Sequence, residues 1–594
     1  MAEEIISLTR AALEQLLAAA RDGRNALNEN PQLALERLQD LVAQLELLAQ
    51  TAPAPPLLRF RPTEAVGAID LRREDDAAQR EELFPNGVSG ASGLPLLRID
   101  AATAAALARG GSSRDPGRLD DLHRARTRSN LYDAIGTEGT IAGISMANLA
   151  ESRWAIVVNA DDDAALIKAL SPLIAQRSAE QGIALPPLHF RDGERCGAWH
   201  ARSVDSALPW DKRPPVLLYQ PGQSASQWLE QHGVMAGPVD PARGVPFYLA
   251  LLGRPGPLEP DDTAFISYGF QYELDIFWGV GRICFTDGAG QHRLADYTTY
   301  AEHVVGCEQR GASAAERLAR EVVYFGTRHA TDAATERSAT ELLAPLAAWH
   351  AEPASLPQRQ GFGQRLLLGE QATRANLSGL LSGPRPPALL FSATHGVGFP
   401  LGDARLVSQQ GGLVCQEWEG FGRIKPEHWL AGADVAELGA RAEGMIALIF
   451  ACYGAGSPQH DEFIINEQRG RPVIAPFPFV AQLPQQLLLH GCLAVLGHVE
   501  RAWSYSFSGK GRARAQIQGF QDIIGRLSEG KRAGEALDQF NVIQAARAVE
   551  LVTELENISF GKQVRDIDLA TLWMARNDAR NYALMGDPAV RLPF

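Results

Sequence analysis

The segment from Ala388 to Gly456 decides the fold of this chain. It begins with Ala-Leu-Leu-Phe-Ser-Ala-Thr-His-Gly (388–396) and ends with Met-Ile-Ala-Leu-Ile-Phe-Ala-Cys-Tyr-Gly-Ala-Gly (445–456). At each end, a short apolar run stops at a reactive side chain, His395 or Cys452. An apolar run without alternation is typical of a buried strand in a parallel sheet. Since α/β sheets hold their chemistry beyond the carboxyl ends of such strands, we expect His395 and Cys452 to lie at one edge.

A cysteine and a histidine at one sheet edge indicate nucleophilic catalysis. The thiolate is the nucleophile, and a neighbouring imidazole lowers the pKa of the thiol or relays its proton. Gly396 lets a substrate carbonyl approach the backbone, so the N–H groups of Gly396 and Cys452 are candidate donors to an oxyanion. The alternative is a buried structural cysteine and a His-Gly turn, but the two motifs together favour catalysis.

Composition predicts a soluble multidomain protein without a nucleic-acid or membrane partner. The chain has 594 residues, a net charge of −14 and 45% hydrophobic residues, so two to four domains are expected. This negative net charge does not indicate a basic surface that would bind nucleic acid or an anionic membrane. No run of apolar residues is long enough for a membrane span.

The cysteines and the N-terminus predict a cytoplasmic protein. The six cysteines (196, 284, 307, 415, 452 and 492) lack the paired spacing of metal ligands, and the acidic start Met-Ala-Glu-Glu has no basic leader. We therefore expect a reduced protein with no cofactor and no metal in its catalytic site, and a structural ion stays open.

Apolar runs alternate with helical patterns from residue 154 onward, which predicts an α/β fold with parallel βαβ units. Two similar layers follow each other. We expect a non-catalytic α/β subdomain over residues 146–350 and a catalytic one over 351–594. Between the two motifs, residues 406–424 are predicted to form a glycine-broken hairpin.

The first 145 residues are harder to interpret. Two leucine stripes in residues 1–50 predict a helical hairpin that is too short to be stable alone. It would dock on the catalytic domain, on a second copy of itself or on a regulatory protein. Residues 51–145 are predicted to be a linker and a regulatory segment. Its polar, basic run 110–128 is predicted to be a solvated loop, with a processing site as the alternative.

The order of these motifs resembles the caspase-like (clan CD) cysteine peptidases, which include caspases, gingipains, separases and CHAT proteases. In the caspase signature, too, a histidine precedes the cysteine by about 50 residues. Three further segments are similar to the gingipain-like branch: 245–255, 270–282 (implied to be a strand and a turn) and 581–592, with its Gly-Asp-Pro. The resemblance implies a caspase-like (Rossmann-like) sheet and a cysteine endopeptidase with a dyad of Cys452 and His395.

The resemblance also implies substrate-binding residues. Cleavage after Arg or Lys needs a buried carboxylate to pair with the desolvated cation. Asp275 is the first candidate, because its segment resembles the gingipain region that bears the specificity acid; Asp403, Asp461 and Glu273 are alternatives. Glu500 and Trp503 follow a predicted strand whose next loop lines the cleft in this family. Trp418 is a candidate wall of the pocket or a core residue.

The sequence therefore predicts an endopeptidase that cuts a protein substrate, after Arg or Lys, through a thioester intermediate. By analogy, an effector role in bacterial defence with a gasdermin-type target is expected. One alternative is a catalytically silent caspase-like scaffold or adaptor. The other is a non-proteolytic thiol enzyme, although the chain has no Gly-x-Ser-x-Gly elbow or dinucleotide loop in a fitting context.

Overall fold

The computed structural model describes residues 82–83, 85–111, 139–234, 238–329, 332–464, 471–504, 507 and 517–594. These residues belong to one compact unit that spans residues 72–594. The predicted hairpin (1–50), the start of the linker and most of the basic run lie outside the described residues.

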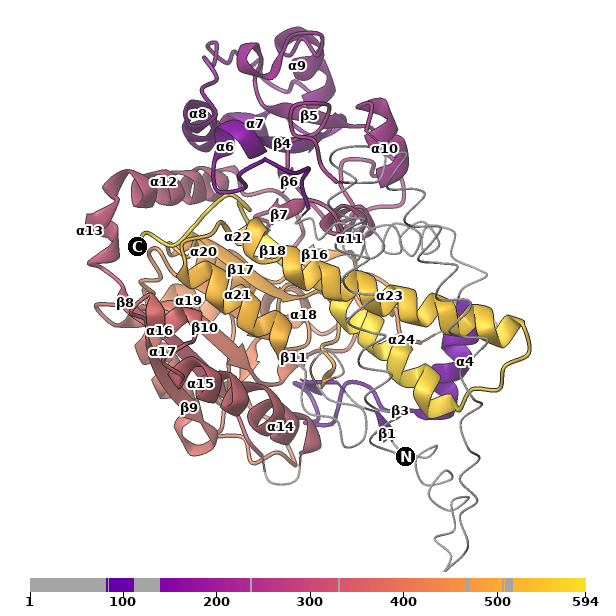
Figure 1. Ribbon diagram of the computed structural model, residues 1–594. Helices are drawn as coiled ribbons and strands as arrows, with labels where there is room; N and C mark the ends of the chain where they lie inside the picture. The colour runs from indigo at the N-terminus through magenta and orange to yellow at the C-terminus, as the bar shows by residue number, and fades with distance from the viewer. Residues whose placement is uncertain are drawn as a thin grey trace, which may run out of the picture. The chain divides into compact units, whose positions relative to one another are not determined.

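A ten-stranded sheet forms the centre of this unit, in the order β5-β4-β6-β7-β18-β17-β14-β10-β8-β9 (Figure 1). All neighbouring strands pair parallel except β17 and β18, which pair antiparallel. The predicted α/β class with a mostly parallel sheet is therefore confirmed. In chain order its strands are β4 (Trp154–Asn159), β5 (Val216–Tyr219), β6 (Tyr248–Leu252), β7 (Gly279–Ile283), β8 (Ala319–Gly326), β9 (Gly363–Leu368), β10 (Pro387–Ala393), β14 (Ile446–Phe450), β17 (Ala494–His498) and β18 (Tyr582–Gly586).

The sheet has two halves whose strands run in opposite directions. Strand β18 is parallel to β7 but antiparallel to β17, so the carboxyl ends of the two halves lie at opposite edges. Strand β8 pairs with β10, which puts residues 319–350 with the catalytic strands. The division into two subdomains at residue 350 stays a prediction, because hydrophobic periodicity reveals strands but not their order in the sheet.

Three small sheets flank the large one. Strand β1 (Glu82–Leu83) pairs with β3 (Ile99–Asp100), and β15 (Gly456–Ser457) pairs with β16 (Phe479–Val480). The third sheet has the order β13 (Trp429–Leu430), β12 (Leu413–Val414), β11 (Gly396–Gly398) and β2 (Gly87–Ser89). It therefore joins the residues that follow His395 to a segment from the start of the described chain.

The helices connect and cover these strands. The long helices α23 and α24 lie side by side, with α4 against α24 (Figure 1). The helices are α4 (Ala101–Gly111), α6 (Leu149–Ser152), α7 (Ala165–Ala169), α8 (Ser171–Glu180), α9 (Cys196–Ser203), η1 (Trp210–Lys212), α10 (Ala225–Gln231), α11 (Tyr268–Asp275), α12 (Leu294–Arg310), α13 (Ala312–Ala315), α14 (Ala333–Arg337), the π-helix η2 (Ser338–Leu343), α15 (Ala344–Ala351), α16 (Leu356–Arg359), η3 (Gly369–Gln371), α17 (Arg374–Ser382), α18 (Leu406–Gln409), η4 (Pro426–His428), α19 (Gly432–Glu437), α20 (Gln482–Leu489), α21 (Gln518–Ser528), α22 (Ala533–Ala536), α23 (Asp538–Ser559) and α24 (Asp566–Arg580).

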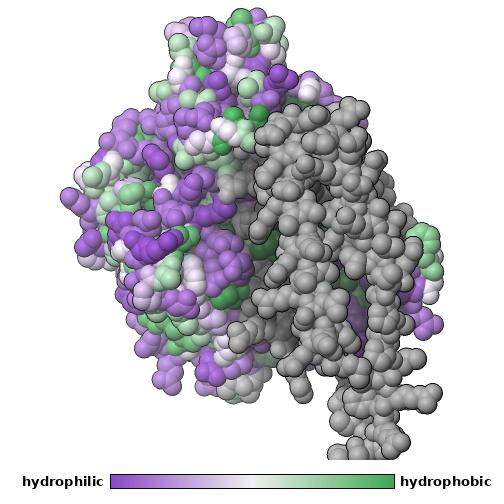
Figure 2. Space-filling view, in the orientation of Figure 1, coloured by the Kyte–Doolittle hydropathy of each residue, from purple (hydrophilic) through white to green (hydrophobic). Residues whose placement is uncertain are grey.

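The visible surface of the described residues is mainly hydrophilic, with scattered apolar side chains (Figure 2).

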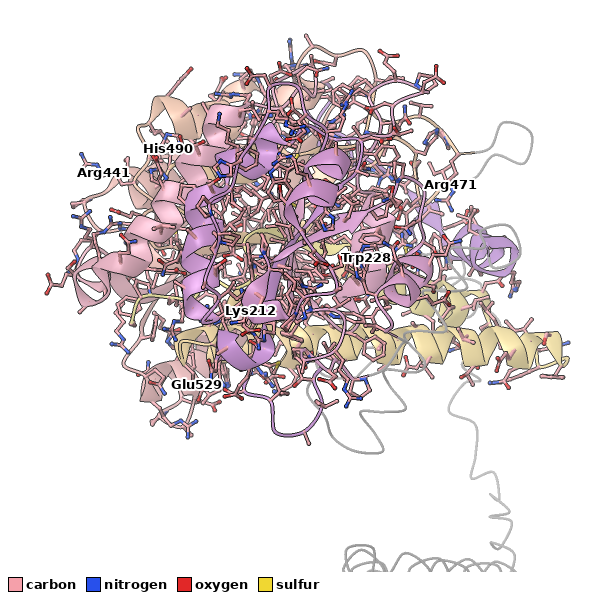
Figure 3. The ribbon with its side chains drawn as sticks, turned by 90° about the horizontal axis from the view of Figure 1, so that it is seen from above. Lys212, Trp228, Arg441, Arg471, His490 and Glu529 are labelled. Atoms are coloured by element: carbon pink, nitrogen blue, oxygen red, sulfur yellow. The ribbon has the colours of Figure 1, made fainter. Side chains whose placement is uncertain are left out.

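Arg441 and His490 lie close together at one side of the molecule (Figure 3). They line a surface cavity of about 510 Å³ with His303, Arg317 and Glu443. Within the described part of the chain, no helix has both the length and the apolar character needed to cross a membrane.

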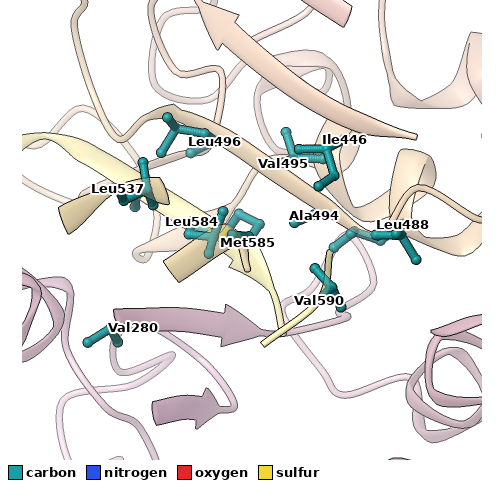
Figure 4. Packing of buried hydrophobic residues seen from close by; sticks show 14 of the residues in the cluster. Val280, Ile446, Leu488, Ala494, Val495, Leu496, Leu537, Leu584, Met585 and Val590 are labelled. Atoms are coloured by element: carbon teal, nitrogen blue, oxygen red, sulfur yellow. The ribbon is translucent and has the colours of Figure 1, made fainter. Parts of the chain in front are cut away.

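The core is continuous across the junction of the two halves. Leu584 and Met585 of β18 lie between Val280 of β7 and the strand β17 residues Val495 and Leu496 (Figure 4). Every residue of β10 and of β14 is buried. This explains why the two decisive motifs are mostly apolar and lack polar alternation, since a central parallel strand has no solvent face.

Two predicted elements differ from the structure. The segment 270–282, expected as a strand and turn, begins within helix α11; the Ser267 side chain caps this helix by accepting a hydrogen bond from the Phe270 N–H (3.1 Å). The aromatic residues suggested a strand, but the N-cap and burial on several sides favour a helix here. The expected hairpin 406–424 instead starts with the short helix α18, and its strand β12 pairs with β11 and β13.

Candidate active site

The structure brings His395 and Cys452 together at one sheet edge. Strands β10 and β14 pair in parallel with Ala393 opposite Phe450, and each reactive residue comes two positions later. The backbone of Gly396, the residue after His395, touches that of Cys452. A Cβ atom added to Gly396 would lie 1.9 Å from the Cys452 carbonyl oxygen. Only glycine fits after the histidine.

Asp332 is a third member of the site that sequence analysis missed. Its Oδ2 lies 2.5 Å from Nε2 of His395. Asp332 caps helix α14 and also accepts a hydrogen bond from the Thr335 hydroxyl at 2.7 Å. Burial alone would raise the pKa of Asp332, but the charge and hydrogen bond of His395, with the Thr335 hydroxyl, hold it well below its usual range. Asp332 is therefore an anion that fixes the imidazole.

The other imidazole nitrogen faces no partner. Nδ1 of His395 is buried and makes no hydrogen bond with any described residue. Since Nε2 is bonded to a carboxylate, Nε2 carries a proton, and Nδ1 is the nitrogen left to exchange one. A nitrogen in this state can accept a proton from a thiol and then deliver it.

The Cys452 sulfur is held beside the loop that follows β17. Its Sγ accepts the Ala502 N–H at 3.3 Å, and the residue is fully buried. Burial raises the pKa of the Cys452 thiol. The resting group is therefore a neutral thiol, and it needs a base to become a nucleophile.

The two predicted oxyanion donors converge on one oxygen. The N–H groups of Gly396 and Cys452 each donate to the backbone carbonyl of Asn86, both at 3.0 Å. Two backbone donors aimed at a single carbonyl oxygen beside a nucleophile have the geometry of an oxyanion hole.

Backbone strain is concentrated next to the nucleophile. Tyr453 has φ of 59° and Glu500 has φ of 73°, both left-handed conformations that non-glycine residues rarely adopt. The Tyr453 N–H donates to the Glu500 carbonyl at 2.5 Å, which ties the two strained residues together. Such residues cost about 1–3 kcal/mol each and cluster at functional sites.

Of the predicted substrate contacts, Trp418 lies against the histidine. Its ring centroid is 6.0 Å from that of His395 and 5.2 Å from that of His329, edge to face. The Glu500 carboxylate is buried and lies 2.5 Å from Nη1 of Arg501. Trp503 is fully buried and packs against Phe463. Trp418 thus borders the site, whereas Glu500 is engaged in an ion pair and Trp503 is part of a hydrophobic cluster.

The structure does not bring Asp275 to this site. In the sheet, β7 beside α11 is separated from β14 by β18 and β17. Burial raises the pKa of Asp275 well above its usual range, and Arg282 opposes this only in part. A neutral carboxyl group does not compensate a guanidinium. Of the alternatives, Asp403 and Asp461 are paired with arginines at 2.7 and 2.8 Å, and Glu273 shares helix α11.

The described residues contain no group of three or more His, Cys, Asp or Glu side chains placed to hold a metal ion. Three surface cavities, of about 670, 510 and 390 Å³, are lined by neither His395 nor Cys452. The thiol and the imidazole are instead covered by protein.

Comparison with solved structures finds the Arg-specific cysteine proteinase gingipain R, at 10% sequence identity and a TM-score of 0.36, over 75% of this chain and 78% of that one. A complex of the pro- and mature domains of RgpB from Porphyromonas gingivalis gives 11% identity and a TM-score of 0.36, over 74% and 79%. The Saccharomyces cerevisiae separase–securin complex gives 8% identity and a TM-score of 0.26, over 61% of this chain and 17% of that one. No protein-family model matches the chain, and no curated protein matches it either.

Proposed function

We propose that this protein is a cysteine endopeptidase with Cys452 as the nucleophile and His395 as the acid–base. Asp332 orients the imidazole. The observation that carries the proposal is the convergence of the Gly396 and Cys452 N–H groups, each at 3.0 Å, on a peptide carbonyl beside the thiol. A peptide carbonyl is the group that a cysteine endopeptidase attacks.

The reaction begins with transfer of the Cys452 proton to Nδ1 of His395. The sulfur attacks the carbonyl carbon of the scissile bond, and the two N–H groups stabilise the oxyanion. As the C–N bond breaks, the imidazolium gives its proton to the leaving amine. Water then attacks the thioester, gives a proton to the imidazole, and the thiol is restored when the carboxylic acid leaves.

The Asp332 anion has a specific role in this sequence. Burial makes a thiolate costly, so the thiol loses its proton only when the imidazole can hold the positive charge. The carboxylate, 2.5 Å from Nε2, stabilises that imidazolium and keeps the ring from turning.

The test is cleavage of internally quenched peptides that differ only in the residue before the scissile bond: Arg, Lys, Asn, Asp, Leu or Ala. We expect cleavage by the protein once its cleft has been opened, and none by Cys452→Ala or His395→Ala under the same condition. Activity that survives in Cys452→Ala would refute the proposed nucleophile. A preference for Arg or Lys and an effector role in bacterial defence remain predictions, and the first is decided by the same panel.

A scaffold or adaptor is the second candidate, favoured by the complete burial of Cys452. It predicts no cleavage of any peptide under any condition, including after the cleft has been opened. The endopeptidase predicts the opposite.

A further inference from the structure

The chain's own residues 85–89 lie in the cleft in the manner of a substrate. The Asn86 carbonyl accepts both proposed oxyanion donors, at 3.0 Å each, and the Asn86 N–H donates to the Ala502 carbonyl at 2.8 Å. Ala502 is also the residue whose N–H touches the sulfur of Cys452. The backbone of Asn86 therefore makes the contacts expected of the residue before a scissile bond.

The next residue lies directly against the nucleophile. A Cβ atom added to Gly87 would be 2.6 Å from Sγ of Cys452, closer than real contacts allow. From there the segment continues as β2, which pairs in parallel with β11, the strand that starts at Gly396. The Gly90 N–H extends this pairing to the Gly398 carbonyl at 2.8 Å. The peptide bond between Asn86 and Gly87 is thus the bond presented to the thiol.

The Asn86 side chain is buried against Ser338. Its Nδ2 donates to the Ser338 hydroxyl at 2.6 Å, and that hydroxyl donates to the Ala334 carbonyl at 2.8 Å. Asn86 and Ser338 are both fully buried. Ser338 and Ala334 belong to η2 and α14, the segment that also supplies Asp332. Nδ2 of Asn86 meets a hydroxyl rather than a carboxylate, while its Oδ1 has no hydrogen-bond partner among the described residues. A neutral side chain that donates a hydrogen bond suits this hydroxyl, whereas the basic residue that the resemblance implied would need a carboxylate.

The segment is anchored on both sides. Leu83 pairs with Ile99 between β1 and β3, and both side chains are buried in the cluster that contains Trp503. Helix α4 follows directly and is joined to α24 by an ion pair of Arg109 and Asp566 at 2.6 Å. The position of residues 85–89 beside Cys452 is therefore fixed by the fold on both sides of the segment.

We propose that residues 85–89 occupy the cleft of this endopeptidase as an internal substrate, with Asn86 in the specificity pocket. The site accordingly selects asparagine before the scissile bond, and it stays closed to other substrates until this segment leaves. This inference rests on the proposed function.

The first experiment opens the cleft with Gly87→Val, because the added side chain collides with Cys452. Gly288→Val is the matched control, since a Cβ at Gly288 meets no atom within 4 Å. The rate at which iodoacetamide alkylates Cys452 is read by peptide mass spectrometry, which does not depend on catalysis. We expect at least a tenfold faster rate in Gly87→Val and no change in the control. An equal rate in all three proteins would refute the closed cleft.

The second experiment tests the pocket, in the Gly87→Val background. Peptides carrying Asn, Gln, Asp, Ala or Arg before the scissile bond are compared, and we expect kcat/KM to be at least tenfold higher for Asn than for the others. Ser338→Ala should lower kcat/KM for the Asn peptide about tenfold and leave the Ala peptide unchanged. Equal rates for all peptides, or a preference for Arg, would refute the asparagine pocket.

A further variant, Asn86→Ala, keeps the test valid if Gly87→Val misfolds, which circular dichroism would reveal. Asn86→Ala removes the contact with Ser338 without adding atoms, and it should also speed alkylation of Cys452.

Different results would refute the endopeptidase and the internal substrate. Faster alkylation without cleavage of any peptide would refute the endopeptidase. Cleavage that is equal in wild type and Gly87→Val would refute the internal substrate alone.

Discussion

Each half of the ten-stranded sheet places a cysteine and an aspartate just beyond the carboxyl ends of its strands, with a histidine nearby. In the half formed by β4 to β7, Nε2 of His292 lies 3.5 Å from Oδ2 of Asp162, and Nδ1 lies 2.8 Å from the Tyr297 hydroxyl. Cys284 follows β7 and shares a hydrogen bond with the same hydroxyl. Burial raises the pKa of Cys284 to about 11. A tyrosine thus stands between this histidine and this cysteine.

The other half uses the same residue types differently. One nitrogen of His395 is fixed by Asp332 at 2.5 Å, and the other is left without a partner. Backbone N–H groups next to Cys452 converge on a carbonyl oxygen, and a peptide lies against its sulfur. The comparison teaches that a buried thiol becomes a candidate nucleophile through a free imidazole nitrogen and paired backbone donors. The residue types alone do not suffice.

The largest expected difference in peptide cleavage is between Cys452→Ala and Cys284→Ala. We expect Cys452→Ala to lower peptide cleavage by at least about 10⁴-fold, because no other group can form the thioester. Cys284→Ala should keep cleavage within twofold and lose about 1 kcal/mol of unfolding free energy. Both are measured by initial rates and chemical denaturation. Comparable losses of activity would mean that the two sets are not functionally different.

Of the two cysteines, only Cys452 is expected to cut the chain itself. Because the Asn86 carbonyl already lies between the oxyanion donors, the wild type should slowly cut its own Asn86–Gly87 bond. Intact mass and N-terminal sequencing over several hours should show a new N-terminus at Gly87. Cys284→Ala should cut itself at the same rate, and Cys452→Ala should stay whole. A cut in Cys452→Ala would point to another agent.

Replacement of Asp332 should lower kcat by orders of magnitude more than replacement of Asp162. Asp332→Asn removes the charge that stabilises the His395 imidazolium, so we expect kcat to fall by about 10²–10⁴-fold with KM nearly unchanged. Asp162→Asn is the matched control and should keep kcat within twofold. If Asp332→Asn retained full kcat, the carboxylate would be a helix cap and nothing more.

The smallest effect concerns two buried histidines, one in each half. Burial, with the charge of His395, lowers the pKa of His329 to about 4; burial, with Arg213 and His200, lowers that of His232 to about 4. An unfolded histidine has a pKa of about 6.5. The unfolded state therefore binds protons first, and the stability that each histidine contributes above pH 6.5 is lost as the pH falls towards 4.

Chemical denaturation at pH 7 and pH 5 measures this loss. The unfolding free energy of the wild type should fall more between these values than that of His329→Gln or His232→Gln, by about 1–3 kcal/mol. In addition, only His329→Gln should change peptide cleavage, since His329 packs on Trp418 beside the active site. Identical slopes in all three proteins would contradict the low pKa values.

Much of the fold could be predicted because its strands are apolar runs. The predicted strands 154–159 and 216–219 match β4 and β5, and the two decisive motifs match β10 and β14. Helix α11 was missed, because aromatic residues packed on a helix resemble those of a strand. The place of β8 beside β10 could not be predicted, because the order of strands in a sheet is set by packing and not by local pattern.

The sequence by itself determined that His395, Gly396 and Cys452 follow the ends of buried strands, since an apolar run is a local signal. Only the tertiary structure decided which groups meet them. Asp332 reaches His395 because β8 lies beside β10, and Asn86 reaches Cys452 because β2 adds to β11. Neither segment has a periodic pattern that points to its partner. Such contacts depend on strand order and on anchoring elsewhere, which the packing of the whole unit sets.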